Sequence, residues 1–154
     1  MVTRGRILGL VLAGCLLLAF AEGKASTQVL KNVEDFEEVV LGSDSVWLIG
    51  FIHADDAAPN VLASVAQELG ERVAVGVAEF KNVKEVAYEN NVRKRNCPQL
   101  RLFTTRSRNS IKLEWANDGA SIAADALAQL SENPVDESGR VKKITLALGG
   151  ASEL

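Results

Sequence analysis

The small number of cysteines in this sequence limits the thiol–disulfide chemistry that the protein can carry out. The chain contains two cysteines, Cys15 and Cys97, and Cys15 lies inside an apolar N-terminal run. A thiolate can attack a disulfide, but a second thiol is needed to resolve the mixed disulfide that forms. If the N-terminal run is removed, Cys97 is the single remaining thiol and no internal disulfide can form. Cys97 is then either a small, half-buried apolar residue or a reactive thiol that forms an intermolecular disulfide with a partner.

A short basic run precedes this cysteine. Arg93, Lys94 and Arg95 would lower the pKa of the Cys97 thiol if they folded back near it. Such a run is usually a solvated surface, and the alternative is a patch that binds an acidic partner. Two further arginines, Arg106 and Arg108, are candidates to extend that patch.

Other residues that could do chemistry stand shortly after the apolar run 46–52. Asp55 and Asp56 come just before Pro59, where a helix is expected to begin. Carboxylates at this position cap the helix and favour its positive end, by about 0.5–2 kcal/mol, and a cation would need more oxygen ligands than this loop offers. His53 is the only histidine, and one histidine with one cysteine does not supply a zinc site. We therefore expect no metal and no cofactor, and we expect His53 to be exposed at a strand end.

The first 21 residues have the pattern of a secretory signal peptide. Two arginines precede an uncharged apolar run over 7–20, and small residues flank Phe20. The run is shorter than the roughly 20 residues that a membrane helix needs. The pattern predicts cleavage after Ala21 or after Ala25, and an uncleaved anchor is the alternative. After cleavage we expect no membrane attachment, and the protein would remain in the endoplasmic reticulum lumen or be secreted. The C-terminal Glu153 and Leu154 match only half of a retention signal.

Length and charge exclude some classes of protein. The 154 residues, 47% hydrophobic and 24% charged, suffice for one domain with a core and argue against disorder. The net charge is −3. Removal of residues 1–21 takes away two arginines and no acidic residue, which leaves 15 basic and 20 acidic side chains and a net charge of −5. A mildly acidic domain gives no reason to expect nucleic acid as a partner.

The remaining sequence alternates short apolar runs with helical patterns. The run 46–52 is almost continuously apolar, as a strand covered on both faces must be. Segments 99–103 and 111–115 alternate with period 2, which predicts a hairpin with one polar face. Two more strands are expected at 29–30 and 73–78. Helices are expected after the capping residues Asn32, Asn82 and Ser121, and from Pro59 to Gly70. The order β-α-β-α-β-α-β-β-α predicts an α/β sheet with helices on both faces.

This order of elements resembles the thioredoxin fold, and particular segments are similar to protein disulfide isomerases, especially the first catalytic domain of the A6 type. Ser43–Phe51 resembles the strand that enters the active site of that domain, and Val73–Ala78 resembles its next strand. Cys97 and Pro98 stand where the family has a cis-proline before a strand. Trp115–Gly119 resembles the family's closing segment.

The resemblance extends from about residue 28 to residue 132. It implies a thioredoxin-like domain over 26–134, with a central mixed sheet, helices on both faces, parallel units first, and then an antiparallel hairpin and a final helix. Residues 135–154 form a tail that is either a flexible extension or a segment that docks.

The departures from the family decide the expected function. Its two active-site cysteines fall on Asp56 and Pro59, and its buried proton-transferring acid falls on Gly50. The resemblance therefore implies a degenerate, redox-inactive site. We expect a non-catalytic module of the secretory pathway that holds an extended peptide or partner protein near a cis-Pro98, in a chaperone-like or adaptor role. Two alternatives remain open: a single-cysteine thiol oxidoreductase or mixed-disulfide trap through Cys97, and a structural subunit of a larger complex.

Overall fold

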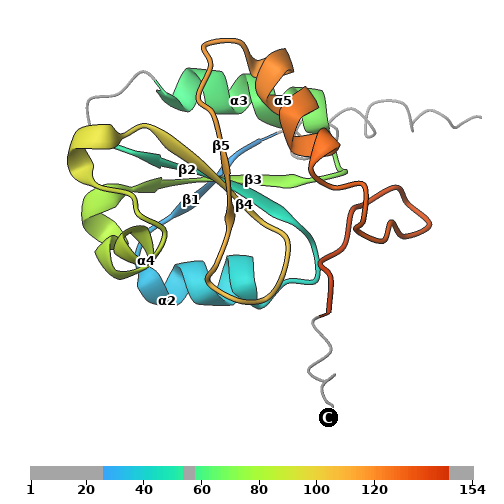
Figure 1. Cartoon of the computed structure of the whole chain (residues 1–154), viewed down its shortest axis with the longest axis horizontal. Helices are drawn as coiled ribbons and strands as arrows, with labels where there is room; N and C mark the ends of the chain where they lie inside the picture. Colours follow the sequence, from blue (N-terminus) through green and yellow to red (C-terminus); the bar gives the residue numbers. More distant parts are fainter. Residues whose placement is uncertain (1–25, 54–57, 146–154) are drawn as a thin grey trace, which may run out of the picture.

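The computed structural model describes residues 26–53 and 58–145. They form a five-stranded sheet with the strand order β1-β3-β2-β4-β5, covered by α3 and α5 on one face and by α2 and α4 on the other (Figure 1). The expected signal peptide, Asp55, Asp56 and residues 146–154 lie outside the described residues. Within the described residues, no helix is long and apolar enough to cross a membrane.

The strands are short and the helices are of unequal length. The strands are β1 (Gln28–Leu30), β2 (Trp47–Ile52), β3 (Ala74–Glu79), β4 (Gln99–Phe103) and β5 (Ile111–Leu113). The helices are α2 (Val33–Phe36), α3 (Ala58–Leu69), α4 (Lys84–Glu89) and α5 (Gly119–Ala128). A π-helical turn, η2 (Glu37–Leu41), continues α2, and η3 (Phe80–Asn82) and η4 (Lys94–Asn96) are single 3₁₀ turns.

The strand β2 is the centre of the molecule, and all six of its residues are buried. Leu48 and Ile52 pack in the core beneath α3 and α5, whereas Trp47, Ile49 and Phe51 pack in the core beneath α2 and α4. The expected strand covered on both faces is confirmed. So is the α/β thioredoxin fold with helices on both faces of a mixed sheet.

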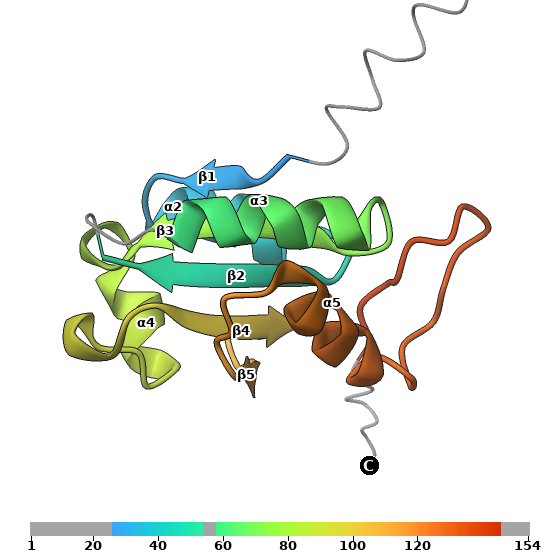
Figure 2. The ribbon, with the colours of Figure 1, turned by 90° about the horizontal axis from the view of Figure 1, so that it is seen from above.

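The direction of the strands determines which chain segments meet. β1, β3 and β2 are parallel, whereas β4 is antiparallel to β2, and Figure 2 shows β2 and β4 pointing in opposite directions. In this register Phe51 lies opposite Ala78 on one side and opposite Gln99 on the other. The segments that follow β2 and β3 and the segment that precedes β4 therefore share one edge of the sheet, which we call the carboxyl edge.

Two of the three predicted helix caps, Asn82 and Ser121, are wrong. Asn32 does cap its helix, because its Oδ1 accepts from the amide of Asp35 at 2.7 Å. Asn82 ends the η3 turn instead, and α4 begins at Lys84 without a side-chain cap.

Helix α5 begins at Gly119, two residues before the expected Ser121 cap. Its cap is Asp118, whose Oδ1 accepts from the amide of Ala120 at 3.2 Å. The Ser121 hydroxyl donates to Oδ2 of Asp118 at 2.8 Å. These bonds, above all the one from Ser121, lower the pKa of Asp118. Where an aspartate precedes a serine by three residues, the aspartate is thus the better prediction for the helix cap. The serine is then its hydrogen-bond donor.

The expected polar face of the hairpin is wrong for β4, because Arg101 is only 5% exposed. Its guanidinium donates to the carbonyl oxygen of Asn90 from Nε at 3.2 Å and from Nη2 at 2.9 Å, and to Oε1 of Gln99 at 2.9 Å. Asn90 is the residue that ends α4, where free carbonyl groups favour a cation. Burial lowers the pKa of Arg101, and the charge of Glu114 opposes that effect. Alternation alone could not tell this buried arginine from an exposed one.

The described part of the expected tail packs against the amino end of β2. The amide of Val46 donates to the carbonyl oxygen of Val141 at 3.1 Å. The amide of Val141 in turn donates to the carbonyl oxygen of Arg72 at 2.8 Å. Val141 is 6% exposed and belongs to the core. Lys143 is also 6% exposed, and its Nζ donates to the carbonyl oxygens of Val40 and of Ser43, the latter at 2.7 Å. Burial, together with the nearby charge of Arg106, lowers the pKa of Lys143 to about 8.

The burial of Lys143 predicts how stability depends on pH. Because its pKa in the folded chain is about 8 rather than the ordinary value of 10.5, the ammonium destabilises the fold at neutral pH, and this penalty is lost as the pH rises between those two values. Between about pH 7 and pH 9.5 the free energy of unfolding should rise by about 2 kcal/mol relative to that of Lys143→Met. Urea denaturation followed by tryptophan fluorescence measures this difference.

The exposed Lys112 on β5 provides the control for this measurement. The stability of Lys112→Met should follow that of the native chain across the same pH range. A constant difference between the native chain and Lys143→Met would contradict the burial of a destabilising ammonium.

Candidate partner-binding site

Cys97 and Pro98 lie at the carboxyl edge, directly before β4. The peptide bond between them is cis, as the resemblance implied. Because Gln99 pairs with Phe51, the two residues lie beside the point where β2 ends. Cys97, Pro98 and Gln99 are half-buried, between the exposed turn η4 and the buried interior of β4.

The thiol of Cys97 lies against its own chain. Its Sγ donates to the carbonyl oxygen of Arg93 at 3.4 Å, and its side chain packs against the core beneath α2 and α4. The guanidinium of Arg93 lies over the ring of Tyr88, 4.7 Å from the ring centre. The backbone of this arginine, rather than its charged group, is therefore the part that contacts the thiol.

The resemblance assigns the family's buried acid to residue 50, and the space above Gly50 is filled. A Cβ at residue 50 would lie 2.5 Å from Cδ1 and 3.0 Å from Cδ2 of Leu62, a fully buried residue of α3. The glycine and the leucine are therefore complementary, and a carboxylate side chain at this position would collide with the packed leucine.

Pro59 is exposed in the first turn of α3. A proline is well suited to this place, because the missing N–H would have had no partner within the helix. It supplies no nucleophile at the position to which the resemblance assigns the family's second cysteine. Asp56, to which the resemblance assigns the first cysteine, lies outside the described residues. Helix α3 ends where the sequence predicts, at Gly70, whose φ of +62° is a left-handed conformation that glycine adopts without strain.

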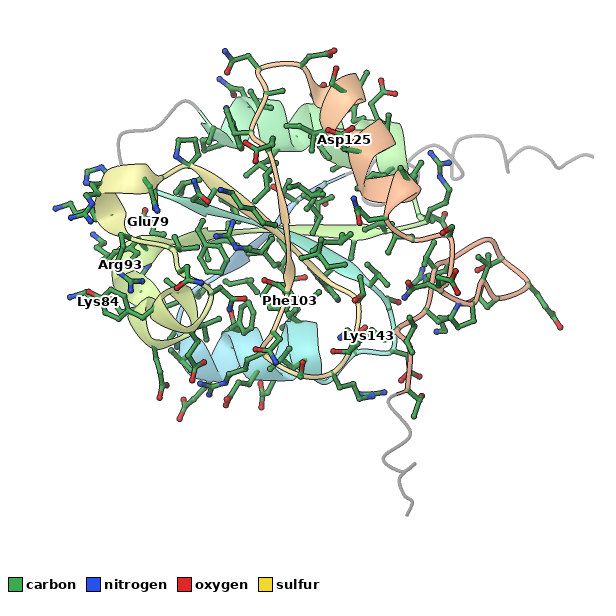
Figure 3. The ribbon with its side chains drawn as sticks, viewed as in Figure 1. Glu79, Lys84, Arg93, Phe103, Asp125 and Lys143 are labelled. Carbon is green, nitrogen blue, oxygen red and sulfur yellow. The ribbon has the colours of Figure 1, made fainter. Side chains whose placement is uncertain are left out.

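A cavity of about 660 Å³ opens at the carboxyl edge and is lined in part by residues 93–95, and we call it the basic cavity. Its apolar part is formed by Ile52, Phe80 and Tyr88. The two aromatic rings meet edge to face, with their centres 5.5 Å apart. Its charged part combines one carboxylate with several cations, and Figure 3 shows Glu79, Lys84 and Arg93 together at this edge, with Lys143 at the opposite end of the sheet. The polar lining residues are His53, Glu79, Lys81, Lys84, Arg93, Lys94 and Arg95.

Sequence reasoning found part of this site. It identified the basic run 93–95 and placed His53 at the end of a strand, although His53 is half-buried rather than exposed. It missed Phe80, Lys81 and the residues that α4 contributes. The signal was available, because Phe80 directly follows an expected parallel strand, and the ends of parallel strands share one edge.

The proposed extension of the basic patch by Arg106 and Arg108 is wrong. The guanidinium of Arg106 pairs with the carboxylate of Asp44, and that of Arg108 pairs with Glu37 and, at 2.9 Å, with Glu89. These arginines lie in the turn after β4, and since β4 is antiparallel to β2, that turn is at the opposite edge of the sheet. The hydrogen bonds that Arg108 donates to Glu37 and Glu89 raise its pKa.

The packing of Gly50 against Leu62 predicts a specific energetic coupling. Gly50→Ala should lower the free energy of unfolding by about 1–3 kcal/mol through overpacking, and Leu62→Ala should lower it by about 2–5 kcal/mol through the cavity it leaves. The double variant should lose clearly less than the sum of the two, because the added methyl group enters the space that the leucine vacates. Urea denaturation of the four proteins measures the coupling.

The matched control pairs Gly50→Ala with Leu69→Ala. Leu69 is fully buried on the same helix, two turns beyond Leu62. These two losses should add. Additive losses in the Leu62 pair as well would show that Leu62 does not occupy the space at residue 50.

Comparison with known proteins supports the fold. No family model matches the chain. Over 113 residues, or 70% of its length, the chain is 30% identical to a protein disulfide-isomerase A6 homolog from Drosophila melanogaster, and it spans about a quarter of that protein's length (25%).

Solved structures give the same result at lower identity. The J-Trx1 fragment of ERdj5 matches with a TM-score of 0.57 and 14% identity, over 70% of this chain and 51% of that chain. Zinc-bound human ERp44 matches with a TM-score of 0.55 and 15% identity, over 72% and 33%. A mutant thioredoxin from Halobacterium salinarum matches with a TM-score of 0.55 and 18% identity, over 72% and 96%. The chain thus has a thioredoxin-like fold and is homologous to proteins of the disulfide isomerase family.

Proposed function

We propose that this chain is a redox-inactive, thioredoxin-like module of the secretory pathway that binds an extended segment of a partner protein beside Pro98. The observation that carries the proposal is the composition of the carboxyl edge. A half-buried backbone segment, Cys97 to Gln99, lies beside the end of β2. No cysteine pair stands at the start of the neighbouring helix, where the corresponding positions are Asp56 and Pro59.

Two features of this edge argue against disulfide exchange. The exchange reaction needs an attacking thiolate and a second thiol that resolves the mixed disulfide, and the sequence between Cys15 and Cys97 contains neither. The space for a proton-transferring acid at residue 50 is filled by Leu62. Restoring that chemistry would require changes in the core as well as at the surface.

Binding of an extended segment remains compatible with this edge. A partner strand would form backbone hydrogen bonds beside Pro98 and place its side chains against the adjoining apolar surface, which is a common mode of peptide recognition. Such binding uses backbone groups and apolar contacts, and it requires no thiol. The role would be chaperone-like or that of an adaptor.

The secretory location rests on the signal-peptide pattern of residues 1–21 and on the similarity to a protein disulfide-isomerase homolog. Retention in the endoplasmic reticulum and secretion are both compatible with it.

A second candidate function is supported by the place of Cys97 beside Pro98. Its thiolate would attack a disulfide of the partner, forming a mixed disulfide and releasing one partner thiolate. This function requires the thiol to leave its hydrogen bond with Arg93.

The proposal predicts suppression of aggregation that does not depend on thiols. Residues 22–154 should reduce the light scattering of a heat-unfolded, cysteine-free model protein to the same extent with and without reductant, and Cys97→Ser should act like the native chain. A photo-crosslinking residue in place of Arg95, which is exposed and precedes Pro98 by three residues, should capture the unfolded protein. The same residue in place of Asp125, exposed on α5, should not (Figure 3).

Two results would count against this proposal. Absence of both suppression and crosslinking at position 95 would exclude peptide binding at this edge. Failure to suppress aggregation of the cysteine-free protein, together with capture of a second, disulfide-containing model protein as a mixed disulfide in non-reducing gels that is lost in Cys97→Ser, would establish the second function instead.

A further inference from the structure

Among the residues that the structure describes, the cations of the basic cavity outnumber its carboxylates. Glu79 is the one carboxylate among the described lining residues, and it pairs with Lys81 at 3.6 Å. Within the described part of the chain, no ion pair joins Lys84, Lys94 or Arg95 to an acidic side chain. This excess of positive charge stands out because the chain as a whole carries a net charge of −3.

The contrast with the other arginines of the molecule sharpens this point. Arg106 and Arg108, at the opposite edge, are paired with Asp44, Glu37 and Glu89. Within the described residues, the arginines at the opposite edge are thus paired with carboxylates, whereas Lys84, Lys94 and Arg95 at the carboxyl edge are not. Clustered charge of one sign in a cavity attracts ligands of the opposite sign.

The cavity also offers an apolar surface to a ligand. Tyr88 is 49% exposed, although the guanidinium of Arg93 lies over its ring and the ring of Phe80 meets it edge to face. These two contacts hold the tyrosine in place at the surface. A half-exposed, immobilised aromatic ring next to unpaired cations is suited to an apolar side chain that is flanked by carboxylates.

We propose that the basic cavity recognises an acidic segment of the partner polypeptide, in which an aromatic or aliphatic side chain stands among aspartate and glutamate residues. The apolar side chain packs on Tyr88 and Phe80. The carboxylates pair with Lys84, Lys94 and Arg95. This inference rests on the proposed function and specifies which segments that function selects.

The chain connects this cavity directly with Pro98. The turn η4 contains Lys94 and Arg95, which line the cavity, and the chain continues from it into Cys97. An extended peptide rises about 3.3 Å per residue, so about three of its residues extend from Arg95 to Pro98. One partner segment can therefore pair with the backbone beside Pro98 and place its acidic part in the cavity.

The test uses residues 22–154 and two fluorescent peptides of equal length. One contains aspartate and glutamate around two phenylalanines, and the other has asparagine and glutamine in their place. Fluorescence anisotropy at low salt should give at least about 10-fold tighter binding of the acidic peptide, and the preference should fall steeply towards about 0.5 M salt. Lys84→Glu and Arg95→Glu should each weaken the binding of the acidic peptide far more than that of the neutral peptide, and so remove most of this preference.

The matched control is Lys112→Glu, which makes the same change of charge at an exposed site on β5, outside the cavity. It should leave the preference close to that of the native chain. Tyr88→Ala should weaken the binding of the acidic peptide, and an acidic peptide without phenylalanine should not respond to Tyr88→Ala.

Each other outcome has a definite meaning. Equal binding of both peptides, insensitive to Lys84→Glu, would overturn the acidic preference and leave peptide binding intact. Failure of both peptides to bind would overturn this inference together with the proposed function. Equal effects of Lys84→Glu and Lys112→Glu would reveal a response to net charge alone and overturn the assignment to this cavity. Tighter binding of a single-stranded oligonucleotide of equal charge, sensitive to Lys84→Glu, would reassign the cavity to a nucleic acid.

Discussion

The burial of β2 on both of its faces is the constraint on which the rest of the structure depends. Its six residues are buried because α3 and α5 cover one side and α2 and α4 cover the other. A buried strand must also have all its backbone groups paired, and β3 and β4 provide that pairing on its two sides. Once β2 is placed, the positions of His53, Phe80 and Cys97 follow from the register.

The same constraint acts at residue 50, the position to which the resemblance assigns the family's buried acid. The residue before Phe51 lies beneath α3, where Leu62 now takes the space above Gly50. A buried carboxylate at this point would cost free energy unless it were paired or hydrogen-bonded, and the apolar side chain of Leu62 carries no such cost.

The charged side chains of the described structure differ in what they contact. Arg101 and Lys143 are buried and donate to backbone carbonyl groups, and Arg108 connects the β4–β5 turn to two acidic side chains. At the carboxyl edge, Lys84, Lys94 and Arg95 form no ion pair within the described residues. This arrangement agrees with the proposed role of these cations in binding a ligand.

The sequence by itself determined the order of elements, the doubly covered strand, the hairpin and the absence of a cysteine pair, because these depend on local hydrophobic periodicity and residue identity. It could not distinguish Arg101, which is buried against the end of α4, from an exposed arginine, nor separate Arg106 from the basic run at 93–95. Both distinctions depend on contacts between residues far apart in the chain. The tertiary structure alone brought α4 and η4 together around Tyr88 and filled the space at Gly50, since sheet register and helix packing decide which distant side chains meet.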